Sequence, residues 1–165
     1  NPKVNSAKNP YSNETALFAM SDGSVCRINE FRRVGHPGGE LMSVYGTEAS
    51  FEYTQGGAVL IGKDFARTTR LDELLRIRPE RHGGTALVQP VERLPAAFAS
   101  LGNEHKGSHQ FLVDDFLRAC VSGEQPPINI WEAANYLAPG YAAHESAMGG
   151  GKQVDVVDLS QPASR

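Results

Sequence analysis

The sequence predicts an α+β fold in which helices pack on one face of a mostly antiparallel, open sheet. Short apolar runs separated by glycine-containing turns fill residues 14–61, which is typical of an antiparallel meander. Helical periodicity dominates residues 107–151 instead. Because strands and helices are segregated along the chain, a parallel α/β arrangement is not expected. We therefore interpret residues 1–165 as a single domain, long enough to bury a core.

The first two strands are expected at 14–20 and 24–34. Asp22-Gly23 lies between these apolar runs, and this pair is a strong hairpin signal because glycine accepts the positive φ of the turn. Arg27, Phe31 and Arg33 alternate with apolar residues on the second strand. One face of this strand is therefore predicted to be apolar, and the other to mix aromatic and cationic groups.

The remaining strands are expected at 40–45, 49–53 and 58–61, with turns at Gly46-Thr47-Glu48 and Gly56-Gly57. The signal is weaker from 62 to 106, where prolines and glycines interrupt every pattern. A short helix at 71–77 and a strand at 86–91 are the elements predicted there. A final strand is predicted at 153–157.

A first long helix is predicted after Gly107. Ser108 is the expected N-cap residue, and Gly123 is the expected left-handed residue after the helix. Side chains at helical spacing form one apolar face, made of Leu112, Val113, Phe116, Leu117, Cys120 and Val121. We expect Leu117 and its neighbours on this face to be buried.

A second long helix is predicted after Asn129. Asn129 and Glu132 have capping-box spacing. Pro139 has no N–H to donate to the carbonyl of Asn135, so a kink or break is expected at that point. His144 falls in the apolar stripe of this helix.

Composition excludes several classes of protein. The net charge of −3, without an evident basic face, argues against a nucleic-acid partner. No apolar run approaches the roughly 20 residues that span a bilayer. Cys26 and Cys120 are expected to be buried free thiols, which suits a reducing compartment and a cytoplasmic location. The chain begins at Asn1, so we interpret it as a processed product or a piece of a longer protein.

Several chemical motifs do not occur in the sequence. No GxGxxG is present, so we expect this chain to bind no dinucleotide cofactor. The run Gly149-Gly150-Gly151-Lys152 lacks the other residues of a P-loop. No HExxH or GxSxG pattern occurs, and no metal site is expected. Asp114 and Asp115 are predicted to lie on a solvated helix face.

The C-terminal half of the chain resembles the C-terminal domain of the Gfo/Idh/MocA oxidoreductase family. The matching residues are Gly107-Ser108-His109 with 112–116, Ala138-Pro139-Gly140 with 144–147, and Gly149-Gly150-Gly151 before 154–156. The Gly46-Thr47 turn between two strands is similar to the family's sheet. The resemblance covers most of residues 14–157 and is strongest from Gly107 onward.

The resemblance implies a glyceraldehyde-3-phosphate dehydrogenase-like C-terminal domain. In this family such a domain covers the substrate, and its open sheet often makes a homo-oligomer contact. NAD or NADP is bound by an N-terminal Rossmann domain, which is not part of this sequence. The family's Glu-Lys-Pro segment has no match here, so no catalytic residue is carried over to this chain.

Five side chains are candidates for binding a small, sugar-like substrate. His109 follows a Gly-Ser turn at a helix start, and the family's equivalent stretch tends to face the substrate pocket. His144 lies just beyond Pro139. Arg32 and Arg33 can bind a carboxylate or phosphate through two hydrogen bonds, and His36 lies in a glycine loop. Each also has a structural interpretation: a locally bonded or buried histidine, or a solvated arginine.

Three functions remain open from the sequence. The first is the substrate-binding and oligomerisation domain of an NAD(P)-dependent oxidoreductase acting on a sugar, polyol or related small molecule. The second is the same architecture in an NAD-dependent glycoside hydrolase. The third is a non-catalytic binding module. A Rossmann fingerprint and Glu-Lys-Pro upstream of this chain would favour the first two.

Overall fold

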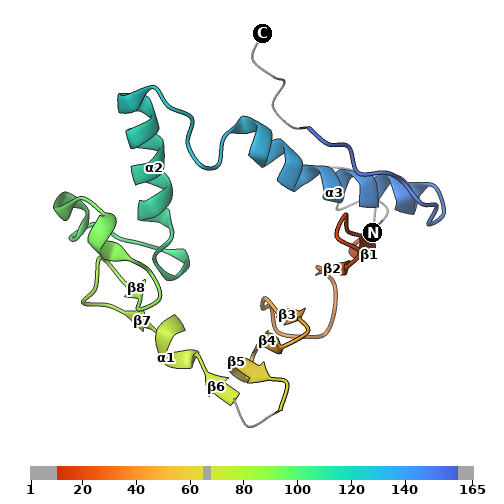
Figure 1. The fold of residues 1–165 in the computed structure, drawn as a ribbon, viewed down its shortest axis with the longest axis horizontal. Helices are drawn as coiled ribbons and strands as arrows, with labels where there is room; N and C mark the ends of the chain where they lie inside the picture. Colours follow the sequence, from red (N-terminus) through yellow and green to blue (C-terminus); the bar gives the residue numbers. More distant parts are fainter. Residues whose placement is uncertain (1–10, 65–67, 160–165) are drawn as a thin grey trace. The chain divides into compact units, whose positions relative to one another are not determined.

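The computed structural model describes residues 11–64 and 68–159, and these residues form an α+β protein with antiparallel sheets (Figure 1). The chain divides into two compact units. The first comprises residues up to Gly38 together with those from Ala134 onward, and the second comprises Gly39–Ala133. Each unit is described by itself. Among the described residues, no helix is both long enough and apolar enough to cross a membrane.

The first unit begins with the predicted hairpin. β1 (Asn13–Ala19) pairs antiparallel with β2 (Val25–Phe31). Gly23 adopts φ +85°, and Asp22 Oδ1 accepts a hydrogen bond of 2.9 Å from the N–H of Ser24. The turn residues therefore act as the sequence predicts.

One face of this hairpin is exposed. The register places Leu17 opposite Arg27, and Asn13 opposite Phe31, on the same face. Leu17 and Val25 are 71% and 72% exposed. The predicted mixed aromatic and cationic face of β2 is thus present, and it carries uncovered apolar side chains.

α3 (Ile130–Met148) begins as predicted and continues where a break was expected. Asn129 Oδ1 accepts hydrogen bonds from the N–H groups of Trp131 (2.9 Å) and Glu132 (3.2 Å). The helix then continues through Pro139 as one element, so of the predicted kink or break, the break is wrong. A proline in a helix removes one hydrogen bond, and the other turns of a 19-residue helix retain theirs.

The strand predicted at 153–157 is also wrong. This segment has no strand partner among the described residues. Side chains of α3 hold it instead: Ser146 donates to the carbonyl of Lys152 (2.6 Å), and Asn135 Oδ1 accepts from the N–H of Leu159 (2.7 Å).

The second unit contains the predicted meander. β3 (Met42–Tyr45), β4 (Ala49–Thr54), β5 (Gly57–Gly62) and β6 (Thr68–Arg70) pair antiparallel in that order. One face is apolar, because Val44, Phe51 and Leu60 are cross-strand neighbours. The antiparallel pairing is thus confirmed, but the described strands form three separate sheets and not one.

The segment between the meander and the first long helix is mostly irregular. It contains α1 (Asp72–Leu75), a two-stranded sheet of β7 (Ile77–Arg78) and β8 (Thr85–Ala86), and the 3₁₀ helices η1 (Val91–Arg93), η2 (Ala96–Phe98) and η3 (His105–Gly107). The helix predicted at 71–77 is present but shorter. The strand predicted at 86–91 is wrong beyond Ala86, because Gln89 and Pro90 turn the chain into η1.

α2 (His109–Ser122) ends as predicted but begins differently. Gly123 adopts φ +73°, and its N–H donates to the carbonyl of Ala119 (2.9 Å). Ser108 does not cap the helix with its side chain. Its backbone is already helical, and its N–H donates to the carbonyl of Glu104 (3.1 Å), so η3 leads directly into α2.

The buried side of α2 is not the apolar face that the sequence predicts. Gln110, Phe111 and Asp114 are buried, and Phe111 packs with Val91, Leu94 and Phe98 in a small core. The predicted apolar face is exposed, including Leu112, Val113, Phe116, Leu117, Cys120 and Val121. The helical period is correct, but hydrogen bonds of Gln110, Asp115 and Arg118 hold the opposite side of the helix against residues 91–101.

The predictions for the two cysteines and for Asp114 are also wrong. Cys120 is exposed and Cys26 is half-buried, so neither is the fully buried thiol expected. Asp114 is 3% exposed and pairs with Arg118 (Nε–Oδ2 2.8 Å), so it does not lie on a solvated face.

Candidate functional site

The second unit holds a strained turn directly before α2. His105, Lys106 and Gly107 are consecutive residues with positive φ, at 49°, 58° and 98°. A left-handed backbone costs a non-glycine residue roughly 1–2 kcal/mol. Such residues persist only where the surrounding structure holds them, and they cluster at functional sites. We call His105–Gly107, with His109 and Tyr53, the left-handed turn site.

A buried hydrogen-bond network fixes the backbone of this turn. Asn103 is 5% exposed, and its Nδ2 donates to Thr85 Oγ1 (2.9 Å) and to the carbonyl of Gly107 (2.9 Å). Its Oδ1 accepts from the N–H of Gln110 (3.1 Å). Glycine is required at 107 for space as well as for φ, since a Cβ there would overlap the side chain of Thr85, which is fully buried.

Gln110 extends the network below the turn. Its Nε2 donates to the carbonyls of Phe98 (3.0 Å) and Leu101 (2.8 Å). The first turn of α2 is therefore tied to Phe98 and Leu101 through the side chain of Gln110, and to Asn103 through the N–H of Gln110. The side chains that the turn presents stand on a rigid support.

Four polar side chains are displayed on this support. Lys106 Nζ donates to Tyr53 Oη at 2.8 Å and lies 4.6 Å from the centroid of the same ring. The rings of His105 and His109 lie side by side, with centroids 4.8 Å apart and planes tilted by 40°. Two imidazoles, an ammonium and a phenol thus come from β4, η3 and the start of α2, as two pairs of side chains. The imidazoles can both donate and accept hydrogen bonds, and the ammonium can donate them.

An ion pair fixes α2 a turn and a half beyond this site. Arg93 donates to both carboxylate oxygens of Asp115, at 2.7 and 3.2 Å, and its guanidinium lies 4.6 Å from the centre of the Phe111 ring. The hydrogen bonds from Arg93, aided by its charge, lower the pKa of Asp115 below its usual value. Asp115 in turn raises the pKa of Arg93.

Only one of the five residues predicted from the sequence belongs to this site. His109 is part of the left-handed turn site, whereas Arg32, Arg33, His36 and His144 belong to the first unit. Arg32 pairs with Glu30 (2.5 Å), and His36 Nδ1 lies 2.7 Å from the carbonyl of Pro37. The backbone of Arg33 is bonded to the side chain of Asn13, and His144 is half-buried on α3.

Three residues of the site were missed by sequence reasoning. His105 and His109 stand four apart in the sequence, and this spacing is a signal that could have been used. Lys106 and Tyr53 carry no such signal. They are 53 positions apart, and only the tertiary fold joins them.

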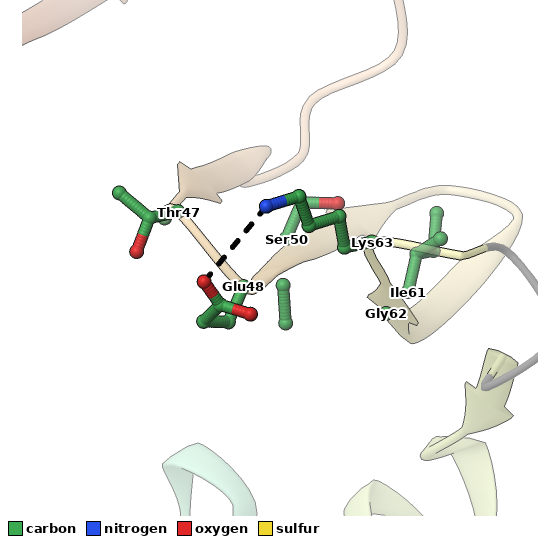
Figure 2. Close-up of a pocket in the computed structure, with 8 residues that line it drawn as sticks. Thr47, Glu48, Ser50, Ile61, Gly62 and Lys63 are labelled. Atoms are coloured by element: carbon green, nitrogen blue, oxygen red, sulfur yellow. Dashed lines mark ion pairs between the residues drawn. The ribbon is translucent and has the colours of Figure 1, made fainter.

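A shallow hollow of about 150 Å³ lies at the other end of β4, beside the Gly46-Thr47 turn (Figure 2). Lys63 and Glu48 approach to 4.0 Å at its rim, as the dashed line in Figure 2 shows. Both side chains are mostly exposed, and the hollow contains no buried polar group that would select a ligand. It is therefore a weaker candidate than the left-handed turn site.

The described residues contain no metal cluster, and the glycine run near the end of the chain is not a phosphate site. No group of three or more His, Cys, Asp or Glu side chains among the described residues could hold a metal ion. The glycine run at 149–151 does not fit a phosphate. Its N–H groups bond back to the carbonyls of Glu145, Ser146 and Ala147 at the end of α3.

The fold and this site define an α+β protein with a rigid, polar site before a helix. Comparisons with protein-family models, with curated proteins and with solved structures found no match.

Proposed function

We propose that this chain is the substrate-binding and oligomerisation domain of an NAD(P)-dependent oxidoreductase that acts on a sugar, polyol or related small molecule. The observation that carries the proposal is the left-handed turn site. Its imidazoles and ammonium stand on a turn whose backbone is fixed by the buried side chain of Asn103, and the phenol of Tyr53 binds the ammonium. The family resemblance of residues 107–156 supports the same assignment. The proposal includes the fold that the resemblance implies, a glyceraldehyde-3-phosphate dehydrogenase-like domain with helices on one face of its sheet.

The chemistry of the site suits a polyhydroxylated substrate. A sugar hydroxyl both donates and accepts hydrogen bonds, and the imidazoles of His105 and His109 offer both functions. Because the backbone of the turn is fixed before binding, little conformational entropy is lost when a ligand is held there. The site would therefore bind and orient the substrate.

In this proposal, two domains of the parent protein have different roles. NAD or NADP, bound by a Rossmann domain of the parent protein, would supply hydride transfer. The residues of this chain would position the substrate. A cytoplasmic location belongs to the same proposal.

The first test is substrate binding by the His109→Ala variant. Losing a hydrogen-bonding imidazole is expected to weaken binding of sugars or polyols about two- to tenfold, since one such bond contributes roughly 0.5–1.5 kcal/mol. Stability should change by less than about 1 kcal/mol, because His109 is exposed and leaves no cavity. Isothermal titration calorimetry against a panel of sugars and polyols measures the binding, and thermal melting measures the stability.

His36→Ala is the matched control, since His36 is an exposed histidine of the first unit. This variant should bind as the wild type does. If the wild type binds no sugar or polyol, or if His109→Ala binds as tightly as His36→Ala, the proposed function is wrong.

A further inference from the structure

Lys106 stands out among the cations of the second unit. Every other described lysine or arginine of this unit pairs with a carboxylate: Lys63, Arg70, Arg76, Arg78, Arg81, Arg93 and Arg118. Lys106 is half-buried and has only the neutral phenol of Tyr53 as its hydrogen-bond partner among the described residues. A partly desolvated ammonium is stabilised by an opposite charge, which the described residues do not supply here.

The backbone position of Lys106 supports the same conclusion. At φ 58° a glycine would be free of strain, and asparagine would tolerate the position better than lysine. A lysine at this position has a cost in stability, so its ammonium is expected to have a use. Tyr53 takes one of the three N–H donors and thereby aims the group, which leaves two donors for a ligand.

We propose that the left-handed turn site takes an anionic substrate, namely a sugar or polyol that carries a phosphate or a carboxylate, and that Lys106 selects it. This inference rests on the proposed function, because it names the substrate class of the same site. Lys106 would donate to the oxygens of the anionic group in a charge-assisted hydrogen bond. His105 and His109, whose rings lie together beside this residue in the chain, would bind neighbouring oxygens.

The experiment is calorimetry of the whole chain with four probes: inorganic phosphate, glucose 6-phosphate, glucuronate and glucose. Lys106→Met removes the charge with an unbranched side chain one atom shorter, in the same strained position, and Lys106→Arg keeps the charge. Lys63→Met is the control, because Lys63 is an exposed lysine of the same unit paired with Glu48. Thermal melting shows whether each variant is folded.

The wild type is expected to bind at least one anionic sugar about tenfold or more tightly than glucose, the ratio that one charge-assisted hydrogen bond gives. Lys106→Met should lose this preference, whereas Lys106→Arg and Lys63→Met should keep it. Stronger binding of glucose 6-phosphate identifies phosphate as the group, and stronger binding of glucuronate identifies carboxylate. The preference should also shrink as salt is added.

Lys106→Gly is a second variant that tests the inference if Lys106→Met fails to fold. It needs no left-handed strain, so it should melt close to or above the wild-type temperature and still lose the preference for anions. A purely structural lysine would give the opposite result, with a lower melting temperature and unchanged binding.

The outcomes separate this inference from the proposed function. If glucose binds as tightly as the anionic sugars, or if Lys106→Met keeps the preference, the inference is overturned and the proposed function stands. If inorganic phosphate binds through Lys106 but no sugar derivative binds better than phosphate, the anion site is supported and the proposed function fails. If none of the four probes binds, both fail.

Discussion

Asn103 is the residue on which the left-handed turn site depends most. Its side chain makes three hydrogen bonds, to Thr85, to Gly107 and from Gln110, and all four residues are buried. A buried polar group without a partner costs about 1–3 kcal/mol. The small apolar core nearby, formed by Val91, Leu94 and Phe111, offers little to compensate for such a loss.

Asn103→Ala is therefore expected to destabilise the protein by about 2–4 kcal/mol, since it leaves several buried partners unpaired at once. Equilibrium unfolding in urea measures the change. Asn29→Ala is the control, because Asn29 is exposed on β2 and should cost less than about 0.5 kcal/mol. Equal midpoints for the two variants would show that the network does not hold the turn.

At this scale the sequence contains few signals for the left-handed turn site. Asn103 and Thr85 are polar residues in a segment without periodicity, and nothing local indicates that both are buried. The left-handed backbone at Lys106 is equally hidden, because lysine rarely adopts it. These features depend on contacts between segments, which a local pattern does not contain.

At the scale of elements, the predictions that succeed are those with a local cause. Asp22-Gly23 makes a hairpin, Asn129 begins α3 and Gly123 ends α2, each through bonds within a few residues. The strand predicted at 86–91 fails at a turn in which the N–H of Gln89 donates to the carbonyl of Ala86. The strand predicted at 153–157 fails because side chains of α3 bind the backbone on either side of that segment.

The orientation of α2 is decided in the same non-local way. The helix has the apolar stripe that the sequence predicts, but this stripe is not the buried side. Asp115 binds Arg93 of η1, so the side that carries Asp115 lies toward the 91–101 segment. The lowered pKa of Asp115 makes the contribution of this pair depend on pH. A carboxylate with a depressed folded pKa stabilises the protein above its unfolded pKa of about 3.9, and the stabilisation is lost as pH falls through the folded value.

Asp115→Asn should therefore lower the free energy of unfolding by about 0.5–1 kcal/mol at pH 7, the range of a partly exposed ion pair. The difference from wild type should shrink below about pH 4 and vanish at lower pH. Unfolding in urea at pH 7 and at pH 3 or below tests this expectation. Glu124→Gln, beyond the end of the same helix, should show no such dependence, and a constant difference for Asp115→Asn would contradict the assignment of the pair.

At the scale of the whole molecule, the main observation is how much apolar surface each unit exposes. In the first unit Leu17, Val25 and Phe31 share the exposed face of the hairpin. In the second unit Val121 is 90% exposed, at the end of the uncovered stripe of α2. Exposed apolar side chains of this kind make each surface a candidate for an interaction with a partner. The sequence predicted the exposed face of the hairpin, because Arg27 and Phe31 alternate with apolar residues along one strand. It predicted wrongly that the apolar stripe of α2 would be buried.

We predict that the chain forms a homo-oligomer, most simply a dimer, through the exposed face of β1 and β2. In a two-fold interface each residue counts twice, so Phe31→Ser should remove about 3 kcal/mol or more of apolar burial and weaken the dimer roughly a hundredfold. Light scattering over a range of protein concentrations measures the association. Leu117→Ser is the matched variant, because Leu117 lies on the exposed stripe of α2. If Leu117→Ser dissociates the oligomer and Phe31→Ser does not, α2 is the interface; if the wild type is monomeric at high concentration, the prediction fails for both surfaces.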